Sequence, residues 1–457
     1  MRARRRRADE GWPELLVGVL AGAWWCRLEL GLIAATAGAY VLMAEVVGGA
    51  AVVAVVLAAW AGAVAVPGVR VRLRDALWRA AVRRSWARAT FDVDLADGPL
   101  KVPRIASVVR VPAGELVRAR VRRGQSVALV ASRAHELAAC LRVRELRVEC
   151  EPGDAAIARL TLVRRDPFAQ PARLTWPAVA AESVSLWEPV PVGVDEYGEQ
   201  VTMRLVERNV LVGGEPGAGK SVALSLLVAA GALDPGVRVW LLDGKLVELA
   251  AWAPIAERVV GPDGEQACEL LRELQAEMDE RYRELLARGL RKVRREDGLP
   301  LHLVVVDELA FYLALPDRKL KAEFAELLRD LVARGRAAGV IVVAATQKPG
   351  ADVVPTALRD LFGFRLALRC NTPQASDTIL GQGWASAGFD ASTVPGGQRG
   401  VGLLLAEEDQ PVRLKTFHLS DEQVAQVSER AAGRRADAWL TTATAATLDF
   451  DSRESDQ

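Results

Sequence analysis

The hydrophobic pattern divides the chain into an apolar N-terminal stretch and a long remainder in which short apolar runs alternate with amphipathic ones. Residues 30–66 contain a single charged side chain, Glu45. This stretch exceeds the roughly 20 apolar residues that one membrane-spanning helix needs, and Gly48-Gly49 supplies a turn near its middle. The pattern therefore predicts a hairpin of two membrane-spanning helices over residues 28–69.

Charge is distributed unevenly, although the formal net charge is only +1. Thirteen arginines and six acidic residues give residues 1–90 a charge of +7, which leaves −6 for the rest. Because arginines flank the apolar stretch on both sides, the positive-inside tendency predicts a plasma-membrane protein with both termini in the cytoplasm. A soluble buried hairpin, or a signal peptide cleaved near Ala21, is the alternative reading of the stretch. The segment Arg70–Arg88 is predicted to form an amphipathic helix that lies on anionic membrane lipid, and an ordinary solvated helix is the alternative.

Residues 101–165 predict a small α+β module. Short strand-like runs surround one helical run, and no group of chemically suggestive residues lies among them. The strands are expected at 105–111, 116–121, 144–150 and 157–163, and the helix at 125–141. Five prolines between residues 167 and 191 then indicate a linker or a strap over the next domain.

A phosphate-binding motif follows the short apolar strand Asn209–Val212. Glycines in such a loop let backbone N–H groups wrap phosphates, and the helix that follows adds a favourable dipole. Lys220 is expected to reach the β- and γ-phosphates, and Ser221 to ligate Mg²⁺. A coincidental glycine-rich turn is the alternative. The motif is GxxxxGK followed by Ser or Thr, and the expected nucleotide-binding residues are this motif and the residue after it. They are Gly214, Glu215, Pro216, Gly217, Ala218, Gly219, Lys220, Ser221 and Val222.

Two more apolar strands end in polar residues suited to the same site. The strand 301–306 is followed by Asp307 and Glu308, which suit a magnesium ligand and a group that polarises the attacking water. The strand 340–345 is followed by Thr346 and Gln347, and Gln347 is interpreted as a γ-phosphate sensor. Together with apolar runs at 238–242 and 364–368, this β/α alternation predicts a predominantly parallel sheet with its ligand at the carboxyl edge.

Several stretches between about residues 190 and 419 resemble the FtsK/SpoIIIE family of DNA translocases, and in particular the transfer (Tra) proteins of actinobacterial conjugative plasmids and integrative elements. The similarity rests on the combination of segments, since each alone is short. The matching segments are VGGEPGAGKSV, VWLLDGKLVELA, MDERYRELLARG, LHLVVVDELA, ARGRAAGVIVVAATQKPGAD and DTILGQG.

The resemblance implies a RecA-like P-loop ATPase that forms a hexameric ring around double-stranded DNA and is anchored by N-terminal helices. It implies ATP and Mg²⁺ as cofactors, with other transfer proteins as further partners. Lys220, Glu308 and Gln347 would be catalytic, Ser221 and Asp307 would hold the metal, and Arg336 or Arg365 would reach a neighbouring subunit's ATP. The loop cluster Arg291, Lys292, Arg294 and Arg295 would track DNA phosphates, or is a solvated loop.

The expected function is transport of plasmid or integrative-element DNA between cells. Chromosome segregation, a secretion-type coupling ATPase acting on proteins, and a membrane scaffold without activity are the alternatives. Only about 50 residues follow the last motor strand, so a complete winged-helix reader of DNA sequence is not expected. The expected organisation is a basic segment (1–27), the hairpin (28–69), a basic helix (70–100), the α+β module (101–165), a linker (166–189), the motor (190–419) and a C-terminal helix with an acidic tail (420–457).

Overall fold

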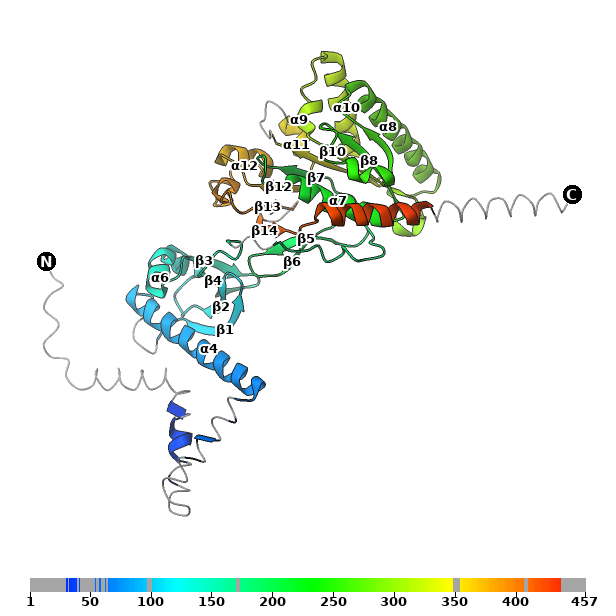
Figure 1. Cartoon of the computed structure of the whole chain (residues 1–457). Helices are drawn as coiled ribbons and strands as arrows, with labels where there is room; N and C mark the ends of the chain where they lie inside the picture. The colour runs from blue at the N-terminus through cyan, green and yellow to red at the C-terminus, as the bar shows by residue number, and fades with distance from the viewer. Residues whose placement is uncertain are drawn as a thin grey trace, which may run out of the picture. The chain divides into compact units, whose positions relative to one another are not determined.

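The chain forms two compact units, residues 1–166 and 167–457 (Figure 1). The computed structural model describes residues 65–96, 101–169, 173–347, 354–406 and 410–436, together with a short stretch, 33–38, and a few positions between residues 30 and 62. The predicted hairpin and the acidic tail lie largely outside these described residues. Among the helices that the described residues form, none combines the length and apolar character required to cross a membrane.

The first unit contains the four strands that the sequence predicts, and these form a small antiparallel sheet. Its strands are arranged in the order β1-β2-β4-β3, and each pairs antiparallel with its neighbour. The predicted helix 125–141 is divided at Arg133 into two short helices. The elements are α4 (Pro67–Asp92), β1 (Arg104–Val111), β2 (Gly114–Arg120), α5 (Val127–Ser132), α6 (Ala134–Leu141), β3 (Glu145–Glu151) and β4 (Asp154–Val163).

Helix α4 contributes its second half to the core of this unit. Val82, Trp86 and Ala89 are buried among the apolar side chains of the sheet and of α6, and the Trp86 indole N–H donates to the Pro103 carbonyl at 2.9 Å. The expectation that the whole stripe of 70–88 lies on lipid is therefore wrong for this half, because protein covers it. Near the start of the helix, Val69 and Val71 are exposed.

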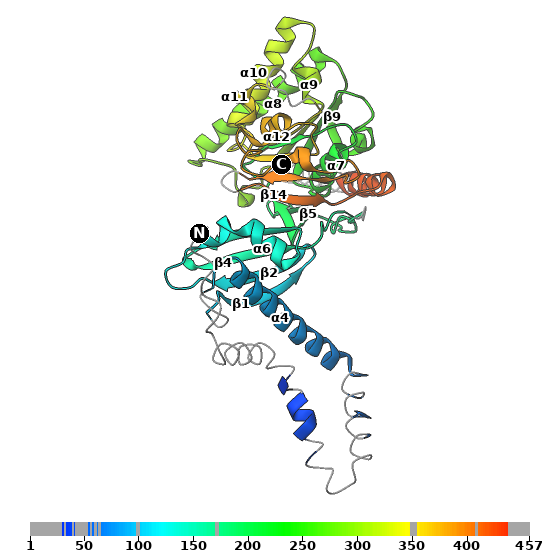
Figure 2. The ribbon, with the colours of Figure 1, turned by 90° about the vertical axis from the view of Figure 1, so that its left-hand side faces the viewer.

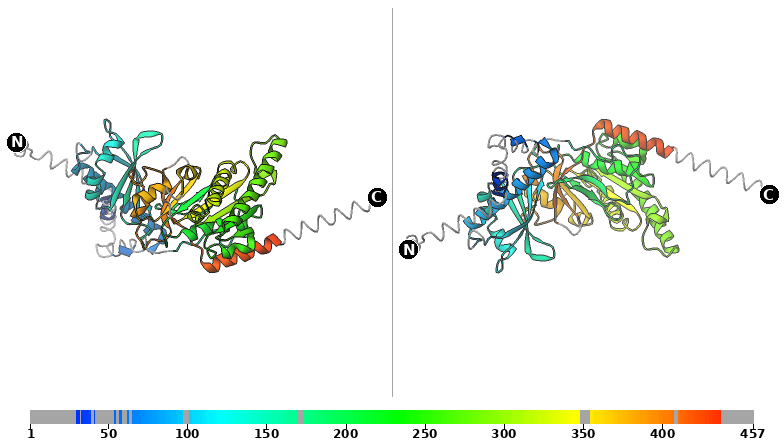
Figure 3. Two further views of the ribbon diagram at one scale, coloured as in Figure 1. Left: turned by 90° about the horizontal axis from the view of Figure 1, so that it is seen from above. Right: turned by 90° about the horizontal axis from the view of Figure 1, so that it is seen from below.

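The second unit is a mixed sheet of ten strands covered by helices on both faces (Figures 2 and 3). The order is β6-β5-β14-β13-β12-β7-β11-β10-β8-β9, and the six strands from β12 to β9 are parallel. The remaining four pair antiparallel, which the sequence did not predict. The strands are β5 (Val190–Asp195), β6 (Gln200–Met203), β7 (Val210–Gly213), β8 (Val237–Asp243), β9 (Ala256–Val260), β10 (Leu301–Asp307), β11 (Val340–Thr346), β12 (Phe364–Leu368), β13 (Val401–Leu405) and β14 (Val412–Thr416).

Alternating side chains of the parallel strands supply two cores. One set packs against α7 and the C-terminal helix over residues 421–436, and the other packs against α8 and α10. Burial on both faces explains why these strands are almost continuously apolar. The helices are α7 (Lys220–Leu233), α8 (Gly264–Ala287), α9 (Leu309–Tyr312), α10 (Arg318–Arg334), α11 (Thr356–Arg359) and α12 (Pro373–Leu380).

A buried polar cluster sits between β10 and α8. His302 is 1% exposed, and its Nδ1 accepts a hydrogen bond from the Trp240 indole at 3.1 Å. Its Nε2 lies 3.2 Å from a Glu277 carboxylate oxygen and 3.1 Å from Arg281 Nη2. Burial, and then the charges of Arg281 and Arg238, lower the pKa of His302 to about 3.

This cluster makes the stability of the fold depend on pH. The unfolded chain binds a proton at His302 below its ordinary pKa of 6.5, whereas the folded chain stays neutral down to about 3. The stabilisation is therefore present above pH 6.5 and is lost as the pH falls towards 3, by up to about 1.4 kcal/mol per pH unit. In urea unfolding followed by tryptophan fluorescence, His302→Gln should lose about 2 kcal/mol less than wild type between about pH 6.5 and pH 4.5. The exposed His135→Gln is the matched control; an equal pH response of His302→Gln and wild type would contradict the account.

Candidate functional site

The motif 214–221 forms a loop between β7 and α7 at the carboxyl edge of the parallel strands. Gly217 and Gly219 adopt φ values of 75° and 109°, which favour glycine. A Cβ on Gly219 would also lie 2.8 Å from the Gly400 nitrogen, because the Gly400 N–H donates to the Ala218 carbonyl at 2.8 Å. The loop thus needs glycine for its backbone shape and for its close approach to the segment before β13.

Glu308 links the phosphate loop to two neighbouring strands. Lys220 Nζ donates to its Oε2 at 3.3 Å. The Thr346 hydroxyl and the Gln347 N–H, at the end of β11, donate to its Oε1 at 3.3 and 3.1 Å. Glu308 itself has φ 53°, an uncommon backbone conformation for a residue with a side chain. The lysine expected to bind phosphate is therefore held by the acid expected to act on water.

Asp307 lies beside this pair at the end of β10 with its carboxylate fully buried. Neither carboxylate oxygen has a hydrogen-bond partner among the described residues, and Lys245 Nζ lies 3.7 Å from Oδ2. Burial raises the pKa of Asp307, and the charges of Lys220 and Lys245 oppose that shift. A buried acceptor without a donor suits a divalent cation, so the donor set of Asp307 and Ser221 fits Mg²⁺. Burial likewise lowers the pKa of Lys220, and the charges of Glu308 and Asp307 oppose this.

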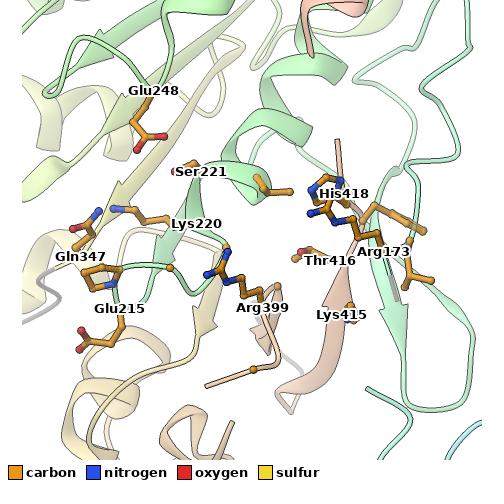
Figure 4. Close-up of a pocket in the computed structure, with 18 residues that line it drawn as sticks. Arg173, Glu215, Lys220, Ser221, Glu248, Gln347, Arg399, Lys415, Thr416 and His418 are labelled. Carbon is orange, nitrogen blue, oxygen red and sulfur yellow. The ribbon is translucent and has the colours of Figure 1, made fainter. Parts of the chain in front are cut away.

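A cavity of about 520 Å³ extends from the phosphate loop across the sheet edge (Figure 4). Lys220, Ser221, Val222 and Gln347, expected from the sequence, line it together with most of the loop. The sequence did not single out Glu248, although it lies in the matching segment VWLLDGKLVELA, or a further group of lining residues, which belong to no motif and come from segments far apart in the chain. The group consists of Arg173, Leu174, Arg399, Lys415, Thr416, Phe417 and His418.

The two candidate arginine fingers lie away from this cavity. Arg336 precedes β11 and Arg365 is the second residue of β12, so both occupy the amino edge of the parallel strands, opposite the phosphate loop. They line a smaller cavity of about 210 Å³. Arg336 Nε donates to the Glu207 carbonyl at 2.6 Å, and Arg365 Nη1 donates to the Leu380 carbonyl at 3.0 Å. The structure does not bring either arginine to Lys220 of the same chain.

The basic loop after α8 engages acidic residues of its own unit. Lys292 pairs with Glu207 at 2.5 Å, and Arg295 pairs with Glu188 at 2.9 Å. Such exposed pairs are weak, so they do not prevent the loop from exchanging its partners for phosphates. DNA contact by this loop stays a prediction.

The Lys220–Glu308 pair leads to a specific expectation for Glu308→Gln. Removing the carboxylate charge frees Lys220 for phosphate and removes the group expected to polarise water. Nucleoside triphosphate should bind a few-fold more tightly, while hydrolysis falls by about 10²-fold or more. Calorimetric titration and phosphate release measure the two effects, with Glu277→Gln as the control for a carboxylate outside the cavity. Weaker binding, or hydrolysis at the wild-type rate, would contradict the assigned role.

Comparisons with known proteins agree with this geometry. Residues 184–383 match the model of the FtsK/SpoIIIE family. The DNA translocase FtsK of Lactococcus lactis subsp. cremoris is 27% identical over 326 residues, which cover 66% of this chain and 42% of that protein. The DNA translocase FtsK of Bacillus cereus is 25% identical over 354 residues, covering 73% and 43%. The chain thus spans about two fifths of the length of these curated relatives.

A solved structure shares the fold. The pCW3 conjugation coupling protein TcpA, in its monomer form with ATPgS, aligns with a TM-score of 0.52 and 19% identity, covering 77% of this chain and 99% of that one. The sheet, the phosphate loop, the Asp307–Glu308 pair and the family match therefore give one conclusion. Residues 184–383 form a P-loop ATPase domain that is similar to those of the FtsK/SpoIIIE family.

Proposed function

We propose that this protein is a membrane-anchored, ATP-driven translocase of double-stranded DNA that assembles as a homo-hexamer and transfers conjugative plasmid or integrative-element DNA between cells. The observation that carries the proposal is the complete hydrolytic constellation at the sheet edge, in which Lys220, Glu308 and the Gln347 N–H meet. A scaffold without activity would not need to keep these groups together.

The geometry supports an order of events at the site. Lys220 must leave Glu308 to contact the β- and γ-phosphates of ATP, which frees one carboxylate oxygen to orient a water molecule. Asp307 and Ser221 are the residues that would hold Mg²⁺, which offsets the charge of the phosphate oxygens when bound. Gln347 follows β11 and donates its N–H to Glu308, so a movement of Glu308 at the γ-phosphate would also displace the backbone of Gln347.

The positions of Arg336 and Arg365 suit a role at the nucleotide of a neighbouring subunit. Arg336 and Arg365 lie on the edge of the sheet opposite their own phosphate loop, so they can assist hydrolysis only at another subunit's nucleotide. This supports a ring. Magnitudes reported for such fingers in other phosphoryl-transfer proteins are about 10³- to 10⁵-fold in rate.

The DNA substrate is proposed from the relatives and the chain's own basic loop. Two FtsK relatives are named DNA translocases, and the solved structure with the same fold is named a conjugation coupling protein. The predicted hairpin 28–69 and the arginines on its flanks support the membrane anchor and a cytoplasmic motor. Membrane lipid and other transfer proteins are the further proposed partners.

The proposed activity is tested by ATP hydrolysis with and without double-stranded DNA. The full chain should hydrolyse ATP several-fold faster with DNA, and Lys220→Ala should reduce the rate by about 10²-fold or more. Arg204→Ala, an exposed arginine outside the cavity, should behave like wild type. No stimulation by DNA would overturn the proposed substrate, and stimulation by a secreted protein instead would favour a secretion-type ATPase. A deletion of the gene separates the two DNA-transport roles. If mating is lost while chromosome segregation stays normal, the protein acts in transfer.

The proposed anchor is tested by fractionation. The full chain should sediment with membranes and resist a carbonate wash, whereas a chain lacking residues 28–66 should stay in the supernatant. Lys220→Ala is the control, since it should sediment like wild type. Release of the full chain by carbonate would contradict a spanning hairpin.

A further inference from the structure

The end of α8 and the loop after it, residues 286–295, form a surface that is both basic and apolar. Leu286 is 81% exposed, Ala287 beside it is exposed, and Leu290 is half-buried. A single exposed leucine is ordinary, but apolar groups surrounded by cations suit a partner that offers carboxylates and apolar side chains together. The exposed basic residues of this basic–apolar surface are Arg288, Arg291, Lys292, Arg294 and Arg295.

The ion pairs that these basic side chains make are weak. Each pair joins two exposed side chains, and such pairs contribute little to stability. Five basic and two acidic residues give residues 286–297 a charge of +3. A segment with several carboxylates can therefore replace the present partners. The pairs are Arg288 with Glu284, Lys292 with Glu207 at 2.5 Å, Arg294 with Glu296 at 3.8 Å and Arg295 with Glu188 at 2.9 Å.

Residues 437–457, the acidic tail, carry the complementary combination in the same chain. Five acidic residues and one arginine give the tail a charge of −4. The sequence Leu448-Asp449-Phe450-Asp451 alternates apolar and acidic residues. The tail and the basic–apolar surface thus match in charge and in apolar character. The charged residues of the tail are Asp437, Asp449, Asp451, Arg453, Glu454 and Asp456.

The acidic tail starts beside the strand that the basic loop leads into. The structure describes the C-terminal helix as far as Ala436, and the Arg435 guanidinium donates to the Val237 carbonyl at 2.8 Å. The Leu301 N–H, at the start of β10, donates to the adjacent Gly236 carbonyl at 2.8 Å. Thirteen residues lead from 436 to 449 and span up to about 43 Å, whereas the 24 residues of α8 span about 36 Å. The alternating segment can therefore reach the surface from within its own chain.

This tail fits the surface better than a nucleic acid backbone does. Phosphates neutralise cations, but they offer no apolar group to cover Leu286. Leu448 and Phe450 can cover it while the acids beside them meet the basic side chains. Attachment to the same chain raises the local concentration of the tail to about the mM range, so individually weak contacts suffice.

We infer that the acidic tail, through residues 448–451, docks on the basic–apolar surface at the end of α8 and competes there with the phosphates of DNA. The docking is independent of the proposed function, whereas the competition rests on the proposed binding of DNA by the basic loop. The docked tail lowers the positive charge of the surface, so DNA binds less tightly until its phosphates displace the tail.

The docking is tested by carbodiimide, which joins a carboxylate directly to an amine that it contacts. Lys292 is the lysine of the basic loop. In the full chain in detergent, peptide mass spectrometry should show Lys292 joined to Asp449 or Asp451. Lys319 and Lys321 are exposed at the start of α10, at the opposite edge of the sheet, and should not be joined to the tail.

Two variants leave every reactive group in place and remove only apolar contact. Leu286→Ser and Phe450→Ala should each reduce the yield of the Lys292 link about fivefold. The matched controls are Leu129→Ser, an exposed leucine of α5, and Thr444→Ala within the tail, and both should leave the yield unchanged. Absence of the link, or an equal yield in Leu286→Ser and wild type, would overturn the docking. A link found only between isotope-labelled and unlabelled copies would overturn its assignment to the same chain.

The competition is tested separately with double-stranded DNA. Saturating DNA should abolish the Lys292 link, and the full chain with Asp449→Asn and Asp451→Asn should bind DNA about threefold to tenfold more tightly at low salt. A link that persists in saturating DNA, or unchanged DNA affinity of the double variant, would overturn the competition. If the full chain binds no DNA, the proposed substrate fails, while the link to Lys292 still decides whether the tail docks.

Discussion

The contact between Lys220 and Glu308 joins the phosphate loop of β7 to the acid that follows β10, and the N–H of Gln347 brings the end of β11 to the same carboxylate. The Glu308 carboxylate thus connects the ends of β7, β10 and β11. The cost of this arrangement is a left-handed backbone at Glu308 and a lysine whose pKa is lowered by burial. The rest of the second unit keeps these strand ends in register.

That register depends on the two apolar layers around the sheet. Parallel strands buried on both faces cannot shift by one residue without exchanging the side chains of the two cores. The core against α7 sets where the loop ends, because Lys220 is the first residue of that helix. The core against α8 and α10 sets the height of Asp307 beside Asp243, its partner in the β8–β10 pairing. Packing far from the nucleotide therefore controls the geometry of the site.

The four antiparallel strands at one side of the sheet have a separate consequence. They place the end of β14 beside residues 173–176, where His418 N–H donates to the Leu174 carbonyl, and they bring Gly400 within hydrogen-bond distance of Ala218. The part of the cavity lined by Arg173 and His418 is formed by segments that precede the phosphate loop and by segments that follow it by about 200 residues. This part of the site exists only because the sheet extends beyond its parallel half.

The sequence alone determined what is local or follows from strand order. The loop 214–221 is specified by glycines at positions that need positive φ, and Asp307 and Gln347 could be placed at one edge because parallel strands share their carboxyl ends. Apolar runs identified the four strands of the first unit and the strands β7, β8, β10, β11 and β12 of the second, since burial requires them. The strands β5, β6, β9 and β14 were not predicted. The tertiary structure alone decided the pairing of Lys220 with Glu308, the covering of Trp86 on α4, and the location of Arg336 and Arg365 on the far edge. It also decided that Arg173 and His418 line the same cavity. These contacts join residues distant in the chain whose types are common, so no local pattern distinguishes them before the sheet is assembled.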